Sequence, residues 1–162
     1  MRFHALGILL MLVTSLFMSC QKEVTQPLYY YEVGIRENHS DWRDSSFVVA
    51  TRNPQLIEEI ERELLLPVSG RKMIFGTVVP GSGGYNKNAD HLFNWHLKED
   101  EWELAERSAE IYDGRPYSDV DADIEYWTKK MTRYAPWNSY IKKRILHQET
   151  KGNYTGLIPL IL

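Results

Sequence analysis

Short apolar runs separated by polar turns predict that most of this chain forms β-strands. Residues 46–52 are apolar at consecutive positions, as in a strand buried on both faces, whereas apolar and polar residues alternate at 92–98 as in a half-buried strand. Residues 101–113 have a helix-favouring composition, but their second half alternates, and we interpret that half as a strand. The regular predicted strands are residues 28–35, 46–52, 72–79 and 92–98.

Other segments have the apolar spacing of amphipathic helices. Residues 54–65 carry aliphatic side chains on one face; Asn53 is the predicted N-cap and Pro54 the first helical residue. Residues 118–132 repeat apolar positions three and four apart, and Ser118 with Asp121 predicts a start resembling a capping box. Residues 136–145 also have roughly helical spacing, which allows a third helix.

These elements predict an α+β fold in a single domain, with an antiparallel sheet of about five or six strands and two or three helices packed against it. The domain is predicted to span residues 28–146, followed by a weakly organised tail at 147–162. A glycine-rich stretch at 80–84 follows a predicted strand. Because the spacing and the Lys-Ser/Thr pair of a P-loop are absent, we interpret it as a flexible hairpin loop.

The apolar run at the start of the chain has a different meaning. A basic start, a short apolar core and a small-residue exit predict a signal peptide at 1–19 rather than a membrane-spanning helix, which needs about 20 apolar residues. The exit resembles a lipoprotein lipobox ending at Cys20, although Phe17 replaces the usual leucine. Residues 20–27 then form a polar tether. Plain secretion after nearby cleavage is the alternative.

Lipidation of Cys20 predicts a Gram-negative envelope protein whose partner is the membrane itself. Several acyl chains on one cysteine give stable anchoring. Gln21 after the cysteine favours delivery to the outer membrane; the periplasmic or surface side stays open. Since Cys20 is the only cysteine, no internal disulfide is expected.

Composition excludes several function classes. A formal net charge of −3 and a sequence pI near 6.0 argue against nucleic-acid binding. His91 and His96 are five residues apart and lack metal-ligand spacing, and no cofactor motif is present, so we expect neither a metal nor a cofactor. No nucleophile motif appears either. His96, Asp113 and Ser139 could be combined into a triad on paper, but nothing local supports it.

Several short motifs recur in an order that resembles a known family. They are YN at 85–86, WHL at 95–97, IYDGRP at 111–116 and YAPWNS at 134–139. The stretch 47–145 resembles the N-terminal domain of a calmodulin-binding protein, a family with many bacterial members. Members tend to have cysteine at the positions of Tyr112 and Ala135, so the resemblance implies that these two residues are neighbours in place of a disulfide.

The resemblance does not imply calmodulin binding here. A calmodulin target is usually a basic amphipathic helix, and Pro136 interrupts the only comparable stretch. A bacterial envelope also lacks calmodulin. We therefore expect a non-catalytic binding or accessory module with a glycan, peptide or protein ligand. The alternative is a small hydrolase with His96 as general base. The candidate binding residues, where the family-like motifs converge, are Tyr85, Trp95, His96, Asp113 and Trp137.

Overall fold

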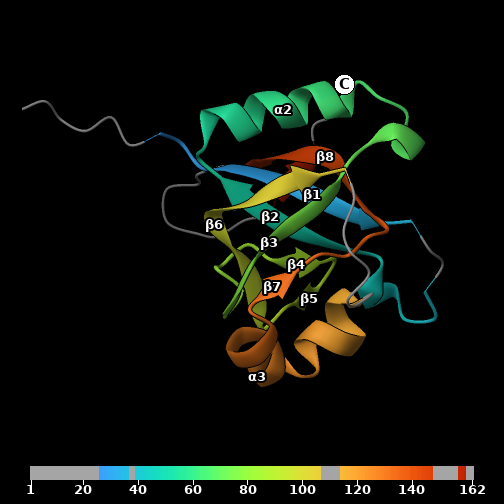
Figure 1. Ribbon diagram of the computed structural model, residues 1–162, viewed down its shortest axis with the longest axis vertical. Helices are drawn as coiled ribbons and strands as arrows, with labels where there is room; N and C mark the ends of the chain where they lie inside the picture. Colours follow the sequence, from blue (N-terminus) through green and yellow to red (C-terminus); the bar gives the residue numbers. More distant parts are fainter. Residues whose placement is uncertain (1–25, 37–38, 107–113, 148–156, 160–162) are drawn as a thin grey trace, which may run out of the picture.

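Two antiparallel sheets enclose the main core in the computed structural model, which describes residues 26–36, 39–106, 114–147 and 157–159 (Figure 1). The first sheet has the order β2-β1-β8-β9, the second β6-β3-β7, and β4 pairs only with β5. The α+β class is confirmed, but the strands form three sheets where we expected one. The strands are β1 (Tyr29–Ile35), β2 (Ser46–Thr51), β3 (Met73–Pro80), β4 (Lys87–Asn88), β5 (His91–Leu92), β6 (Trp95–Ala105), β7 (Arg133–Tyr134), β8 (Ser139–His147) and β9 (Leu157–Pro159).

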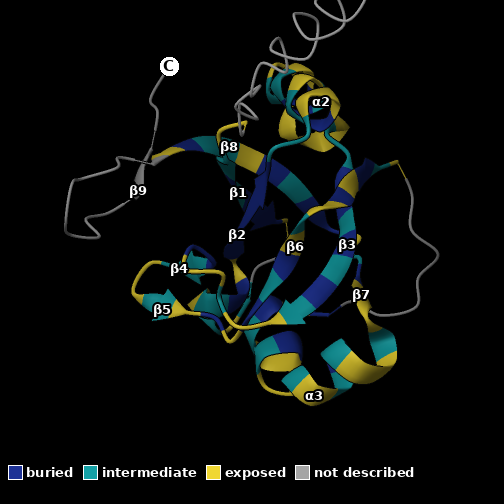
Figure 2. Ribbon diagram, turned by 90° about the vertical axis from the view of Figure 1, so that its left-hand side faces the viewer, coloured by how far each residue is buried: buried dark blue, intermediate teal, exposed yellow. Residues whose placement is uncertain are grey.

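The helices close opposite ends of the domain (Figure 2). Helix α2 (Pro54–Leu64) lies at one end and begins as predicted, because the Asn53 side chain accepts hydrogen bonds from the backbone N–H groups of Gln55 and Leu56. Leu56 and Ile60 of its apolar face are buried in the main core. Two single turns of 3₁₀ helix, η2 (Trp42–Asp44) and η3 (Val68–Gly70), lie in the connections.

The helix predicted at 118–132 is wrong in its start and its continuity. Two π-helical turns, η4 (Pro116–Asp121) and η5 (Trp127–Met131), flank the short α3 (Ile124–Tyr126). Ser118 is not an N-cap. Its backbone N–H and that of Tyr117 donate to the buried Asp44 carboxylate of η2, and Asp121 accepts from the Asn94 backbone instead. A tertiary contact therefore replaces the local cap.

The helical spacing at 136–145 is also misleading, since this segment belongs to β8. The pairing of β1 with β8 shifts register between Glu32 and Val33, which is a β-bulge. Ile141 lies in the main core, but Ile145 lies in a second cluster on the other face of the sheet. The bulge interrupts the alternation by which a strand is identified. The first half of 101–113 is likewise strand, as part of β6, and 107–113 lies outside the described residues.

Strand β2 is buried on both faces, as predicted. Phe47 and Val49 lie in the main core between the sheets. Val48 and Ala50 face the other way and form the second cluster with Tyr85 and Ile145. The loop after β3 thus covers part of the outer face of the first sheet, and a groove lies beside it.

Candidate functional site

Two of the candidate binding residues are core residues rather than ligand contacts. Trp95 is fully buried, and its indole N–H donates to the Pro116 carbonyl at 3.0 Å. Tyr85 is also buried; its hydroxyl donates to the Leu97 carbonyl at 3.1 Å, and burial raises its pKa well above the ordinary value. Neither ring has a free face for a ligand. This corrects the expectation that both contact one.

His96 lies on the outer, polar side of β6, and the glycine-rich loop packs against it. Its Nδ1 lies 2.5 Å from the Gly81 carbonyl oxygen, so Nδ1 carries the proton of that hydrogen bond, and Nε2 lies 3.9 Å from a Glu99 carboxylate oxygen. The rings of His96 and Tyr85 are edge-to-face, 5.6 Å apart. Gly83 has φ +62°, and a Cβ there would approach the Tyr85 ring to 2.7 Å. The loop therefore depends on glycine to reach these rings.

The other expected residues are not brought together with them. Trp137 is 41% exposed, in the connection from β7 to β8. Asp113 lies outside the described residues, as do Tyr112 and Cys20. Of the five candidates, the structure joins Tyr85 with His96 and places Trp95 on the opposite side of β6.

A polar groove of about 220 Å³ lies on the outer face of the first sheet, next to the second cluster. Asn86, fully buried, holds its outer wall in place: its Oδ1 accepts from the Val48 N–H at 2.9 Å, and its Nδ2 donates to the Trp95 carbonyl at 2.7 Å. Lys87 and Asn88 follow directly in β4. The groove is lined by Glu32, Ser46, Val48, Lys87, Asn88, Ala89, Lys143 and Ile145.

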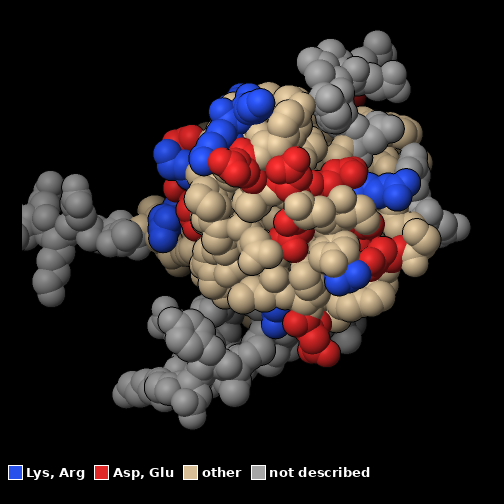
Figure 3. Space-filling view, turned by 90° about the horizontal axis from the view of Figure 1, so that it is seen from below, with Lys and Arg blue, Asp and Glu red and all other residues tan. Residues whose placement is uncertain are grey.

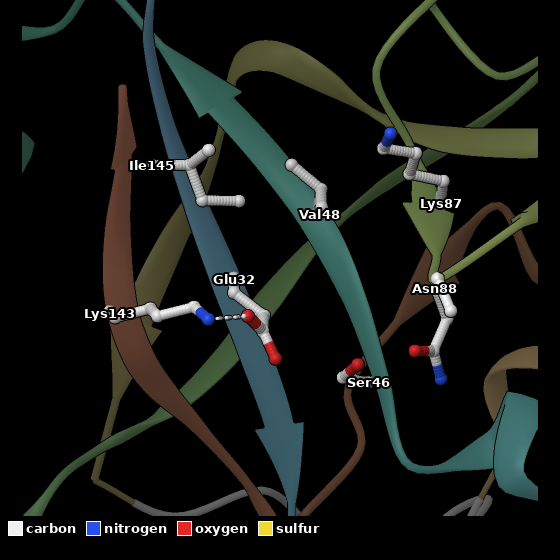
Figure 4. Close-up of a pocket in the computed structure, with 8 residues that line it drawn as sticks. Glu32, Ser46, Val48, Lys87, Asn88, Lys143 and Ile145 are labelled. Atoms are coloured by element: carbon white, nitrogen blue, oxygen red, sulfur yellow. Dashed lines mark ion pairs between the residues drawn. The ribbon is translucent and has the colours of Figure 1, made fainter. Parts of the chain in front are cut away.

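The polar side chains of the groove come from three strands and from the loop (Figure 4). The Ser46 hydroxyl and the Asn88 side-chain oxygen face each other across it, and Lys87 extends from the same wall as Asn88. The Asn88 amide nitrogen is held by the Trp42 carbonyl at 2.8 Å and the Ser45 hydroxyl at 3.1 Å. The amide oxygen is therefore oriented towards the groove.

Glu32 balances two lysines on the opposite wall. Its carboxylate lies 2.7 Å from the Lys142 ammonium and 2.9 Å from the Lys143 ammonium. Burial alone would raise the pKa of Glu32, but the hydrogen bonds and charges of the two lysines outweigh burial and hold it below its ordinary value. Glu32 is therefore ionised at neutral pH, and the lysines exceed it by one positive charge.

A second, larger groove of about 440 Å³ lies between the first half of α2 and the outer face of the second sheet. Four carboxylates line it, but they have local partners or are open to solvent. Asp100 accepts from the Thr51 hydroxyl and from the backbone N–H groups of Arg52 and Asn53. Arg133 lies over the Phe75 ring, 4.2 Å from its centroid. These contacts organise the start of α2. The four carboxylates are Glu59, Asp100, Glu101 and Glu103.

Other features of the described residues bear on chemistry. They contain no group of three or more His, Cys, Asp or Glu arranged to hold a metal ion. Within the same part of the chain, no helix has the length and apolar character needed to cross a membrane. At the end that carries α3, acidic and basic side chains are separated by uncharged surface, without a broad basic face (Figure 3).

Sequence reasoning did not find the residues of the polar groove. Lys87 and Asn88 directly follow the Tyr85-Asn86 motif, which was the one local signal pointing to this wall. Ser46 and Glu32 carry no such signal. They meet Lys87 only through the pairing of β1 with β2 and the placement of the loop over β2.

The fold and the groove define a small α+β domain with a polar binding groove on the outside of a sheet. The sequence model of the BP-74 N-terminal domain matches residues 33–148, and the chain belongs to this family. The resemblance found from the motifs is therefore confirmed, and the match begins earlier, within β1. No curated protein and no solved structure matches the chain.

Proposed function

We propose that this chain is a lipid-anchored lipoprotein of a Gram-negative envelope whose domain is a non-catalytic binding or accessory module. The polar groove carries the binding part of this proposal. Ser46 is 5% exposed, and neither its hydroxyl nor the Lys87 ammonium has a partner among the described residues. Buried polar groups are normally paired, so a ligand that satisfies both groups explains their placement.

The lipid anchor rests on the leader and Cys20. The apolar run ends at the only cysteine of the chain, and a polar tether follows before β1. Acylation at Cys20 would hold the domain at a membrane surface, which suits a module that acts on a ligand or partner in the envelope.

A binding role fits the surroundings of His96 better than hydrolysis does. A general base needs hydrogen-bond access to the proton that it removes. The His96 ring is engaged by Gly81 on one side and faces Glu99 on the other, and His96 lines neither groove described above. We therefore assign it to holding the glycine-rich loop on the Tyr85 side of the domain.

Fractionation of cells tests the anchor. Wild type should incorporate labelled palmitate and sediment with membranes, whereas Cys20→Ala should incorporate none and be released or remain as unprocessed precursor. Unchanged labelling, processing and sedimentation of Cys20→Ala would contradict the lipoprotein assignment. The Cys20→Ser variant is the matched conservative change and should behave as Cys20→Ala does.

Site-specific photocrosslinking tests the binding role. Ala89 lines the groove and is exposed, so a photoreactive residue there should give a discrete adduct with an envelope component, read by mass spectrometry of the purified protein. Ala122, exposed between η4 and α3, is the control and should give none. The same adducts from both positions, or none from position 89, would contradict a ligand in this groove.

A further inference from the structure

The polar groove has a charge imbalance that identifies the chemistry of its ligand. Three lysine ammonium groups lie in or beside it, and Glu32 is the one carboxylate among its lining residues. Lys142 and Lys143 share that carboxylate. Lys87, on the wall opposite Lys143, has no carboxylate among the described residues (Figure 4). One positive charge at this wall therefore lacks a counter-charge within the described part of the protein.

A hydroxyl donor lies on the same side of the imbalance. Ser46 is more than nine-tenths buried, and its hydroxyl points into the groove towards Asn88. The Asn88 oxygen is an acceptor, so the Ser46 hydroxyl and the Lys87 ammonium supply the donors. An ammonium and a hydroxyl together suit one anionic oxygen group.

The floor limits what can carry that group. Val48 and Ile145 are buried aliphatic residues, so the inner part of the groove is apolar. A volume of about 220 Å³ is smaller than the pockets that hold drug-sized ligands, which measure roughly 300–1,000 Å³. The groove therefore suits a single short stem that is aliphatic along its length and charged at its end.

We propose that the groove binds the side chain of a glutamate in an acidic peptide segment of a partner, with Lys87 as the counter-charge and Ser46 as a hydrogen-bond donor. The proposal deepens the proposed function and rests on the groove being its binding site. The two methylene groups of glutamate would lie on Val48 and Ile145, and the carboxylate would lie between Lys87 and Ser46.

Two other anionic ligands fit less well. A phosphate group needs several converging donors, usually including backbone N–H groups, and the Val48 N–H is already bound to Asn86. An acidic sugar presents hydroxyl groups around its ring, and the aliphatic floor of Val48 and Ile145 gives them no partners. Glutamate matches both the single free charge and the apolar floor.

Titration of the purified full-length protein in detergent micelles tests the ligand class. The probes are N-acetyl-glutamate methylamide, the isosteric N-acetyl-glutamine methylamide, glucuronate and inorganic phosphate, followed by ligand-observed NMR. We expect the capped glutamate to bind about tenfold or more tightly than the capped glutamine. Equal binding of these two would overturn the proposal, and so would tighter binding of glucuronate or phosphate.

Charge variants test the assigned roles. Lys87→Gln should weaken glutamate binding about three- to tenfold, and Lys87→Arg should restore most of it. Ser46→Ala should also weaken binding. Glu32→Gln removes a negative charge from the groove and should strengthen binding about two- to fivefold. Lys130→Gln, at an equally unpartnered lysine in η5, is the matched control and should change nothing.

The pattern of failure separates the proposal from the function on which it rests. If Lys87→Gln behaves as Lys130→Gln does while both variants keep the wild-type melting temperature, the glutamate proposal is wrong. If the Ala89 crosslink persists in that case, the groove binds a different ligand and the binding function stands. If the crosslink also fails, the binding function falls with it.

Discussion

The Asn86 side chain takes the place of a neighbouring strand at the edge of β2 by accepting the Val48 backbone N–H at 2.9 Å. On its other side the Asn86 amide donates to the Trp95 carbonyl at the start of β6. One fully buried amide thus ties the first sheet to the second and fixes the loop from which Lys87 and Asn88 extend. The polar groove exists because this side chain holds β4 over the outer face of β2.

Asn86→Ala should therefore both destabilise the domain and open the groove. The change leaves a buried N–H and a buried C=O unpaired, which costs about 1–3 kcal/mol for each group. We expect the free energy of unfolding in urea to fall by about 2–4 kcal/mol. Asn94→Ala, at an exposed asparagine, is the control and should change it by about 0.5 kcal/mol or less. Equal effects of the two variants would contradict this role of Asn86.

Arg71 stabilises the bulge that disguises β8 in the sequence. Its guanidinium donates to the Ile141 carbonyl at 2.8 Å and to the Lys142 carbonyl at 3.3 Å. It also donates to the carbonyls of Leu64 and Leu66 at the end of α2. The β8 bulge and the end of α2 are therefore held by the same side chain.

Arg71→Met should lower the free energy of unfolding by about 1–3 kcal/mol, because it leaves these partly buried carbonyls without their donor. Thermal and urea unfolding measure the loss. Arg62→Met removes an exposed ion pair with Glu58 on α2 and should cost no more than about 0.5 kcal/mol. A loss for Arg71→Met as small as that of Arg62→Met would show that the bulge does not need its arginine.

Asp44 replaces the predicted local cap of the helical segment that begins at Pro116. It is 1% exposed and accepts from the Tyr117 N–H at 2.8 Å and the Ser118 N–H at 2.9 Å. We expect Asp44→Ala to destabilise the protein by about 2 kcal/mol, at the upper end of cap substitutions. Asp90→Ala, at an exposed acid on the β4–β5 turn, is the control, and the melting temperatures of the two variants compare them. Equal melting temperatures would restore the local cap predicted from Ser118.

Acid should weaken the domain through Glu32 and Asp100. Burial opposes ionisation at both, but the hydrogen bonds that they accept lower both pKa values. A lowered folded-state pKa gives stability that is fully present above the unfolded value of about 4 and is lost as the pH falls through the folded value. The urea midpoint of wild type should therefore fall between about pH 5 and pH 3, and the variant carrying Glu32→Gln and Asp100→Asn should fall less steeply. Parallel curves would contradict the shifts.

The sequence predicts the elements whose signals are local. Asn53 and Pro54 mark the start of α2 because a cap and its helix are adjacent in the chain. The consecutive apolar residues of β2 identify a doubly buried strand because both of its faces are covered. The family could be inferred for the same reason, since its motifs are short and contiguous.

The features that escaped prediction depend on contacts between distant segments. The bulge in β8 breaks the alternation of Ile141 and Ile145, and it is set by the pairing with β1. The start of η4 is set by Asp44, more than seventy residues earlier. The polar groove brings Ser46 and Lys87 together only after Asn86 has joined β2 to β6. Without that register, Lys87 is one surface lysine among many.

Chemical-shift mapping of the isotope-labelled full-length protein tests the central claim, a glutamate-binding groove between β2 and β4, most directly. On addition of N-acetyl-glutamate methylamide, the backbone amides of Ser46, Val48, Lys87, Asn88 and Lys143 should shift together and saturably, and Lys87→Gln should abolish most of the response. Shifts centred on Asn53, Glu59 and Glu103 in the second groove, or no saturable shifts, would contradict it.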